Sequence, residues 1–135
     1  MLDVLHVIED TCAVYLLVDE SSRSAVAIDA GSGRWLDQLP WYGVDRVADV
    51  LVTHHHRDQV EGVPRLVTAG TRVWVPEGEA DLIAGVDRHW QQRRVVNNYD
   101  LHTDRFSLLE SVRIAGVMKD YSARRGGHLD VRTLP

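Results

Sequence analysis

The sequence predicts an α/β fold in which helices flank a mixed β-sheet. Three observations carry this prediction: two apolar runs joined by a polar turn, a strand–helix–strand unit, and a helical pattern whose charges change from acidic to basic. Composition agrees, because 44% hydrophobic and 26% charged residues are typical of a folded globular chain. A length of 135 residues suits one domain, so we predict a single domain over residues 1–135.

The amino-terminal part of the sequence has the pattern of a β-hairpin preceded by another strand. Residues 13–19 and 25–29 are rich in branched apolar side chains and flank a polar turn. Residues 2–7 are apolar with looser alternation and predict the preceding strand. After the hairpin, glycines break the pattern, and residues 34–39 predict a brief helical turn that Pro40 ends.

The middle of the sequence predicts a βαβ crossover. Residues 49–53 and 72–75 are strand candidates, and residues 60–69 between them have apolar side chains at helical spacing. Residues 77–94 predict a further helix, because their early acidic and late basic residues complement the helix dipole.

The carboxy-terminal part gives weaker patterns. Residues 106–109 and 112–117 predict two strands, residues 119–127 a polar loop, and residues 129–135 a last strand.

Two of the predicted strands need cover on both faces. Residues 14–18 and 50–52 are apolar at successive positions, which is typical of strands buried on both sides. One layer of helices covers one face only. We therefore expect either a second sheet on the open face or self-association, because an exposed apolar sheet face favours association.

Charge and cysteine content exclude several classes of function. The formal net charge of -5 disfavours nucleic acid as a partner. No apolar stretch is long enough to span a membrane, and Glu9 and Asp10 interrupt the region that a signal peptide would need. The single cysteine, Cys12, forms no internal disulfide and has the context of a small buried hydrophobe. We predict a cytoplasmic protein that acts on a small molecule.

Three candidate metal ligands follow the predicted strand at residues 49–53. In an extended segment alternate side chains point the same way, so His54, His56 and Asp58 can converge while neighbouring side chains point elsewhere. Imidazole and carboxylate suit zinc, and also iron or manganese. The end of a strand is where ligands gather in α/β sheets. The alternative is a solvated histidine-rich loop with incidental metal affinity.

The segment from Thr53 to Gln59, followed by Glu61-Gly62, resembles the first metal-binding signature of the metallo-β-lactamase superfamily, His-x-His-x-Asp-His after an apolar strand. The hairpin that ends in Asp29-Ala30-Gly31 is similar to the start of that family, and the order of elements over residues 2–75 agrees. The resemblance implies an αββα sandwich of which this chain holds the first αβ half. The domain at residues 1–135 is then expected to be incomplete at its carboxy terminus.

The resemblance also implies roles for individual residues. His54 and His56 would bind the first metal, and Asp58 would bind a second metal or orient the attacking water, which makes Asp58 the catalytic candidate. Asp29 would not bind the metal but would hold the ligating imidazoles in the required tautomer. Gln59 stands where the signature has its last histidine, and an amide is a poorer zinc ligand than imidazole. One metal ion, with zinc before iron or manganese, is therefore expected.

The activity that the resemblance implies is metal-dependent hydrolysis of an ester, thioester, lactone, amide or phosphoester by activated water. The family's later ligands, which include a third histidine in a Gly-His motif, are not recognisable in the sequence. His128 is an alternative source of that ligand, although it precedes the last predicted strand. The rival hypothesis is a truncated or degenerate non-catalytic relative that acts by self-association. A homo-oligomer could also supply ligands from a second copy.

Overall fold

The structure is a computed structural model that describes residues 3–88, 108, 110–120 and 123–134. The strands within these residues are β1 (Asp3–Glu9), β2 (Ala13–Asp19), β3 (Ser24–Ile28), β4 (Arg46–Leu51), β5 (Arg72–Pro76), β6 (Gly116–Met118), β7 (Ala123–Gly126) and β8 (Leu129–Arg132). The helical segments are the 3-10 helices η1 (Arg34–Tyr42) and η2 (Glu77–Glu79) and the α-helices α1 (Arg57–Val60), α2 (Val63–Thr68) and α3 (Asp81–Ala84). No helix in the described ranges is long and apolar enough to cross a membrane.

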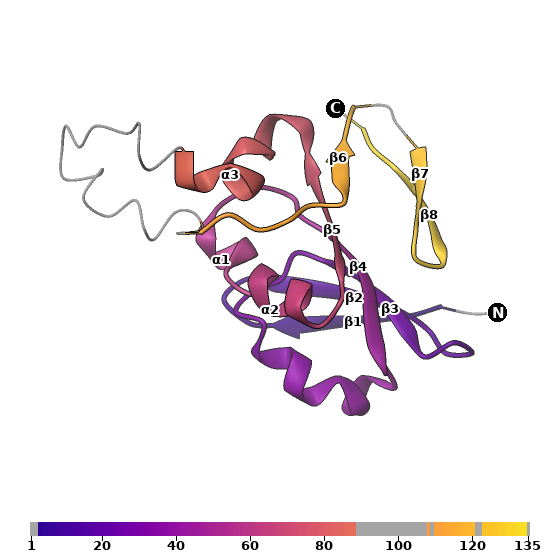
Figure 1. The fold of residues 1–135 in the computed structure, drawn as a ribbon. Helices are drawn as coiled ribbons and strands as arrows, with labels where there is room; N and C mark the ends of the chain where they lie inside the picture. Colours follow the sequence, from indigo (N-terminus) through magenta and orange to yellow (C-terminus); the bar gives the residue numbers. More distant parts are fainter. Residues whose placement is uncertain (1–2, 89–107, 109, 121–122, 135) are drawn as a thin grey trace.

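Six strands form one mixed sheet in the order β1-β2-β3-β4-β5-β6 (Figure 1). β1, β2 and β3 pair antiparallel, whereas β3, β4, β5 and β6 run parallel. α1 and α2 connect β4 to β5, so the predicted βαβ crossover is confirmed. The predicted α/β class with a mixed sheet is also confirmed. Parallel pairing brings the carboxyl ends of β3, β4 and β5 to one edge of the sheet.

The hydrophobic core lies between the helices and one face of this sheet. Val14 and Leu16 of β2 and Val50 of β4 point to that face and are fully buried. Val63 and Leu66 of α2 belong to the same apolar cluster. Period-two alternation on the strands and a spacing of three on the helix explain why these side chains meet. Burial of each such side chain contributes about 1.5–3 kcal/mol.

The opposite face of the sheet is covered near its middle. The hairpin of β7 and β8 turns at Gly127, where an added Cβ would lie 2.8 Å from Cγ2 of Val26. Beside this turn, the fully buried carboxylate of Asp49 accepts hydrogen bonds from Nη2 of Arg72 at 3.0 Å and from Nε1 of Trp74 at 2.8 Å. A buried carboxylate needs such partners, because desolvation otherwise disfavours its charge.

The same face is open at the β1–β2 end. Leu5 and Val7 of β1 are 55% and 56% exposed, and Tyr15 of β2, which pairs with Val7, is 42% exposed. These three residues form an apolar surface that we call the β1–β2 patch. The expectation of cover on both faces therefore holds at the β7–β8 hairpin, whereas the β1–β2 patch lacks cover in the part of the chain that the structure describes.

Some predicted boundaries in the first half of the chain are wrong. The helix predicted at residues 60–69 is α2, which begins later, at Val63, because Val60 ends the separate helix α1. The two helices are divided at Gly62, where the chain passes so close to another loop that an added Cβ would lie 2.4 Å from the backbone nitrogen of Gly33. Pro40 lies inside η1 instead of ending it. A kink at Gln38 divides η1, so Pro40 falls in the first turn after the kink, where proline is tolerated.

Boundaries in the second half also differ. The helix predicted at residues 77–94 is interrupted at Gly85, and its part beyond residue 88 lies outside the described residues. The strand predicted at residues 112–117 is the shorter β6. The polar loop predicted at residues 119–127 contains β7, because backbone pairing in an edge hairpin does not require apolar side chains. The strand predicted at residues 106–109 lies, except for Leu108, outside the described residues.

Candidate functional site

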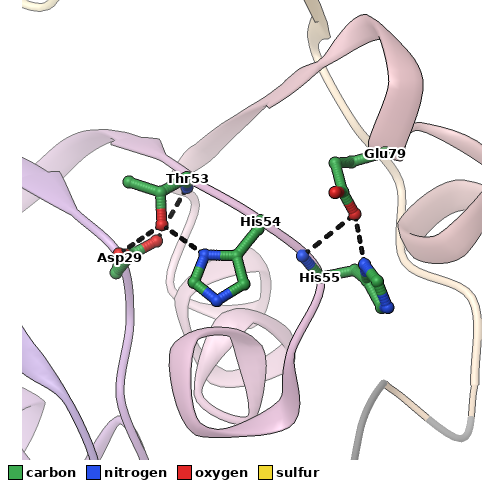
Figure 2. A network of polar contacts seen from close by, with 5 residues as sticks. All are labelled: Asp29, Thr53, His54, His55 and Glu79. Carbon is green, nitrogen blue, oxygen red and sulfur yellow. Dashed lines mark hydrogen bonds and ion pairs between the residues drawn. The ribbon is translucent and has the colours of Figure 1, made fainter.

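Side chains that can bind a metal ion or exchange a proton gather where three parallel strands end. Asp29 directly follows β3, His54 and His55 lie in the loop after β4, and Glu79 lies in η2 after β5 (Figure 2). Neighbouring parallel strands end at the same edge, so residues distant in sequence meet there. The sequence predicted His54, His56 and Asp58 at this site, and Asp29 through the family resemblance, but it did not predict Glu79.

Asp29 is held in a conformation that aims its carboxylate across the site. Its φ of 62° is left-handed, a region that aspartate tolerates better than most residues, and its backbone N–H donates to the carbonyl of Leu51 at 2.9 Å. The carboxylate accepts two hydrogen bonds from Thr53, one from the backbone N–H at 2.8 Å and one from the hydroxyl at 2.7 Å. The loop after β4 is thus tied to β3.

The hydroxyl of Thr53 also contacts Nδ1 of His54 at 2.9 Å. Because the hydroxyl gives its one proton to the carboxylate of Asp29, it can only accept from His54. Nδ1 of His54 then carries the proton, and Nε2 presents its lone pair. A neutral imidazole with a free Nε2 is the form that binds a metal ion. The expected support of His54 by Asp29 therefore runs through Thr53, a residue that the signature alone did not single out.

Burial raises the pKa of the Asp29 carboxyl, and the hydrogen bonds from Thr53 and the attraction of His54 oppose that rise in part. Asp58 adds a smaller repulsion in the same direction as burial, so the two carboxylates influence each other at this edge. A carboxyl group whose pKa is raised by burial and lowered by hydrogen bonds is typical of functional sites.

His55 points away from His54 and toward Glu79 (Figure 2). One carboxylate oxygen of Glu79, Oε2, accepts the backbone N–H of His55 at 3.1 Å and forms a short contact with Nδ1 of the same residue. Both side chains are mostly buried. His54 and His55 are consecutive, and their side chains point in different directions, as expected of neighbours in an extended segment.

His56 lies beside both of its neighbours. Its ring centroid is 4.7 Å from that of His54 and 5.1 Å from that of His55, and both ring pairs are edge-to-face. His56 also precedes α1 as its N-cap residue, with extended backbone angles. The two predicted histidine ligands are therefore brought together.

Asp58 and Gln59 lie in α1, which carries them next to the histidine loop. The backbone carbonyl of Asp58 accepts the hydroxyl of Thr11 at 2.7 Å, and that of Gln59 accepts the N–H of Ala30 at 2.8 Å. The side-chain oxygen Oε1 of Gln59 is buried and has no hydrogen-bond partner among the described residues. Buried oxygens of this kind are normally satisfied by protein or by ordered water.

The donors fit a metal ion in chemical type: two adjacent imidazoles and a nearby carboxylate. Among the residues that the structure describes, however, no group of three or more His, Cys, Asp and Glu side chains is arranged to hold an ion. Convergence of Asp58 with His54 and His56 therefore stays a prediction.

Cys12 lies near this site but is poorly suited to react. Burial, followed by repulsion from Asp29, raises the pKa of its thiol to about 11, and Asp58 adds to the rise. A thiol with so high a pKa is almost entirely protonated near neutral pH. This agrees with its interpretation as a small packing residue.

His128, considered as a substitute ligand, lies at the other end of the sheet. Its Nε2 is 3.0 Å from Oδ1 of Asp3, at the start of β1. With Arg46 and Arg72 it lines a hollow of about 460 Å³ where β4 and β5 begin. It is therefore not placed with His54 and His56 in this chain.

No family model matches the chain. Its sequence is similar to proteins named hydroxyacylglutathione hydrolase. That of Pseudomonas paraeruginosa (strain DSM 24068 / PA7) is 41% identical over 71 residues, which are 49% of this chain and 26% of the relative. That of Pseudomonas savastanoi pv. phaseolicola is 38% identical over 78 residues, which are 55% of this chain and 29% of the relative. The matched part thus spans less than a third of either relative.

Solved structures with a similar backbone are metallo-β-lactamases. A mutant enzyme from Cronobacter sakazakii superposes with a TM-score of 0.68 at 18% identity, covering 98% of this chain and 50% of that one. The enzyme MIM-1 from Novosphingobium pentaromativorans gives 0.64 at 18% identity, covering 87% and 42%. The HARLDQ motif named for the Cronobacter protein ends in Asp-Gln, and residues 58 and 59 of this chain are also Asp and Gln.

Proposed function

This chain has the metallo-β-lactamase fold, and from that premise we propose that it carries the metal-binding part of a metal-dependent hydrolase. The relatives named hydroxyacylglutathione hydrolase indicate hydrolase chemistry and make a thioester the first substrate class to test. Esters, lactones, amides and phosphoesters are the other classes within the proposal, because one fold hosts many reactions.

The observation that carries the proposal is the hydrogen-bonded chain from Asp29 through Thr53 to His54. It fixes the proton on Nδ1 of His54 and leaves Nε2 free, an arrangement that a merely solvated loop does not need. Solvated histidines rotate and exchange tautomers, whereas this one is tied to a buried carboxylate.

In this proposal His54, through Nε2, and His56 hold the metal ion, and Asp58 either adds a carboxylate or orients the attacking water. When bound, the ion lowers the pKa of water to about 7 and polarises the scissile group. Zinc fits this donor set, and iron or manganese also fits it. One ion is favoured over two, because Gln59 offers an amide where the superfamily signature has a second-metal histidine.

Metal content tests the proposal directly. The chain, purified without a histidine tag, should hold near-stoichiometric metal by elemental analysis. The double variant His54→Ala/His56→Ala should lose it, whereas His128→Ala, at the other end of the sheet, should keep it. Metal-loaded protein would then be assayed on thioesters before the other substrate classes. Equal metal contents in all three proteins, or none in any, would overturn the proposal.

The β1–β2 patch favours a second candidate function, a non-catalytic protein that acts by self-association. Leu5, Val7 and Tyr15 expose apolar surface on a regular sheet face, where another copy could pack. A single domain over residues 1–135, a cytoplasmic location and a homo-oligomer also stay proposals.

A further inference from the structure

We propose that Glu79 is a positioning residue that selects which histidines face the metal, because it holds His55 out of the ligand set. The inference rests on the proposed function, since it concerns the same metal site. It assigns a role to a residue that lies 24 positions beyond His55 and outside the histidine signature.

Distance alone does not decide which two of the three consecutive histidines bind a metal. The ring of His56 is 4.7 Å from His54 and 5.1 Å from His55, so both pairs are close enough to compete for one ion. What separates them is the direction of each ring, which the partner of its Nδ1 sets. Nδ1 of His54 faces the hydroxyl of Thr53, and Nδ1 of His55 faces the carboxylate of Glu79 on the other side of the loop (Figure 2).

Glu79 holds His55 at two points with one oxygen. Oε2 accepts the backbone N–H at 3.1 Å and contacts Nδ1 of the ring, so both the path of the loop and the direction of the ring are fixed. The two side chains are largely shielded from water, which strengthens hydrogen bonds to the carboxylate. Figure 2 shows His54 and His55 on opposite sides of the loop, each facing its own partner.

The position of Glu79 is set independently of the histidine loop. η2 follows β5 directly, and the N–H of Ala80 donates to the carbonyl of Glu77 at 3.4 Å. β5 also holds the start of the loop, because the N–H of Val52 donates to the carbonyl of Trp74 at 2.9 Å. The loop is thus anchored to the end of β3 through Thr53 and Asp29, to β5 through Val52, and to η2 through His55.

Loss of Glu79 would free His55 to compete with His54 for the ion. The ligand set would then exchange between arrangements, and the geometry that Thr53 prepares would no longer dominate. Removal of a partner that orients a ligating residue typically changes metal affinity roughly 10- to 100-fold, and we take that as the scale of the loss expected in Glu79→Ala, where the ligands themselves exchange.

The test measures zinc affinity by competition with a chromogenic chelator, and the visible spectrum of the cobalt-substituted protein. Glu79→Ala should bind zinc roughly 10- to 100-fold more weakly and alter the cobalt spectrum. Glu79→Met, which keeps the side-chain length, should do the same if the alanine variant fails to fold.

Two further variants serve as controls. Glu79→Gln keeps an acceptor oxygen and should bind zinc nearly as tightly as the wild type does. Glu77→Ala, in the same 3-10 helix but paired with Lys119, is the matched control and should bind as the wild type does.

A second substitution tests whether Glu79 selects the ligating histidines or only stabilises the loop. His55→Ala added to Glu79→Ala should recover most of the lost affinity, because the competing imidazole is gone. A double variant as weak as Glu79→Ala would overturn the inference, and so would unchanged affinity in Glu79→Ala and Glu79→Met. Those results leave the proposed function standing, whereas wild-type protein that binds no metal would overturn both.

Discussion

Individual side chains prepare this site before any ion is bound. Thr53 illustrates this, because its hydroxyl has a single proton and that proton is committed to Asp29. The only role left toward His54 is that of acceptor, so a carboxylate behind the threonine decides which ring nitrogen is free. The ring nitrogen that His54 leaves free is thus set by a residue that is not itself one of the proposed ligands.

Thr53→Val tests this chain of hydrogen bonds. Valine keeps the shape of threonine but cannot accept from Nδ1 of His54, so we expect zinc affinity to fall roughly 10- to 100-fold. Nitrogen-15 NMR of the imidazole should also show mixed tautomers of His54. Thr68→Val is the control, because the hydroxyl of Thr68 bonds only the carbonyl of Pro64 within α2. Unchanged zinc affinity in Thr53→Val would argue that Asp29 supports the backbone alone.

Cys12 gives a pH-dependent prediction at the same scale. Its pKa is raised to about 11, so the fold favours the neutral thiol, and this contribution to stability is lost as pH rises from about 9 through about 11. At pH 9 iodoacetamide should alkylate folded protein roughly 50-fold more slowly than urea-unfolded protein, because about half of the unfolded thiol but only about 1% of the folded thiol is thiolate at that pH. Mass spectrometry follows both reactions. Equal rates would show that the thiol is not buried beside Asp29.

The sequence predicted which histidines point together but not what holds them. His54, Asp58 and Asp29 could be found from alternation after a strand and from the resemblance to a known signature. Glu79 could not, because its contact with His55 spans 24 residues and arises only when β4 and β5 pair in parallel. A glutamate in a charged segment carries no local signal of such a contact.

At the scale of elements, one close crossing between loops positions the histidine segment. The N–H of Gly62 donates to the carbonyl of Gly31 at 2.7 Å, and the N–H of Ala30 donates to the carbonyl of Gln59 at 2.8 Å. These bonds join the loop after β3 to the junction of α1 and α2. Only glycine permits the approach, because an added Cβ on Gly62 would lie 2.4 Å from the nitrogen of Gly33.

Gly62→Ala should therefore destabilise the fold and also displace the histidine segment. We expect a loss of about 2 kcal/mol or more in the free energy of unfolding, because the new methyl group meets backbone that cannot move alone. Urea denaturation measures it. Gly78→Ala is the control, since nothing lies within 4 Å of an added Cβ there. Equal stabilities of the two variants would show that the crossing relaxes easily.

Strands were predicted more accurately than helices for a physical reason. Runs of branched apolar residues along β2 and β3 indicate burial within a sheet, and that signal depends mainly on local sequence. The helix boundaries depend on tertiary contacts instead. The break between α1 and α2 follows from the approach of Gly62 to Gly33, and no property of residues 60–69 alone reveals that the two loops meet.

At the scale of the whole molecule, the two faces of the sheet have different surroundings. Helices pack on the face that carries the apolar core, while the β7–β8 hairpin approaches the other face near Val26 and Asp49. The sequence predicted that both faces need cover, because its strands are apolar at successive positions. It could not show where the cover is missing, since that depends on which strands lie beneath the hairpin.

The β1–β2 patch should make the chain associate with itself. Leu5, Val7 and Tyr15 present apolar surface on a paired, regular strand, and two copies that bury these patches would remove it from water. Sedimentation velocity across a range of protein concentrations should show a reversible dimer. Val7→Lys should shift the protein to monomer, because a lysine at the centre of the contact would have to lose its hydration.

The control is Trp41→Lys. Trp41 lies on η1 and is also exposed, so this variant should leave the dimer unchanged. A wild-type chain that stays monomeric at every concentration, or a dimer that both lysine variants disrupt equally, would show that this patch is not the contact surface.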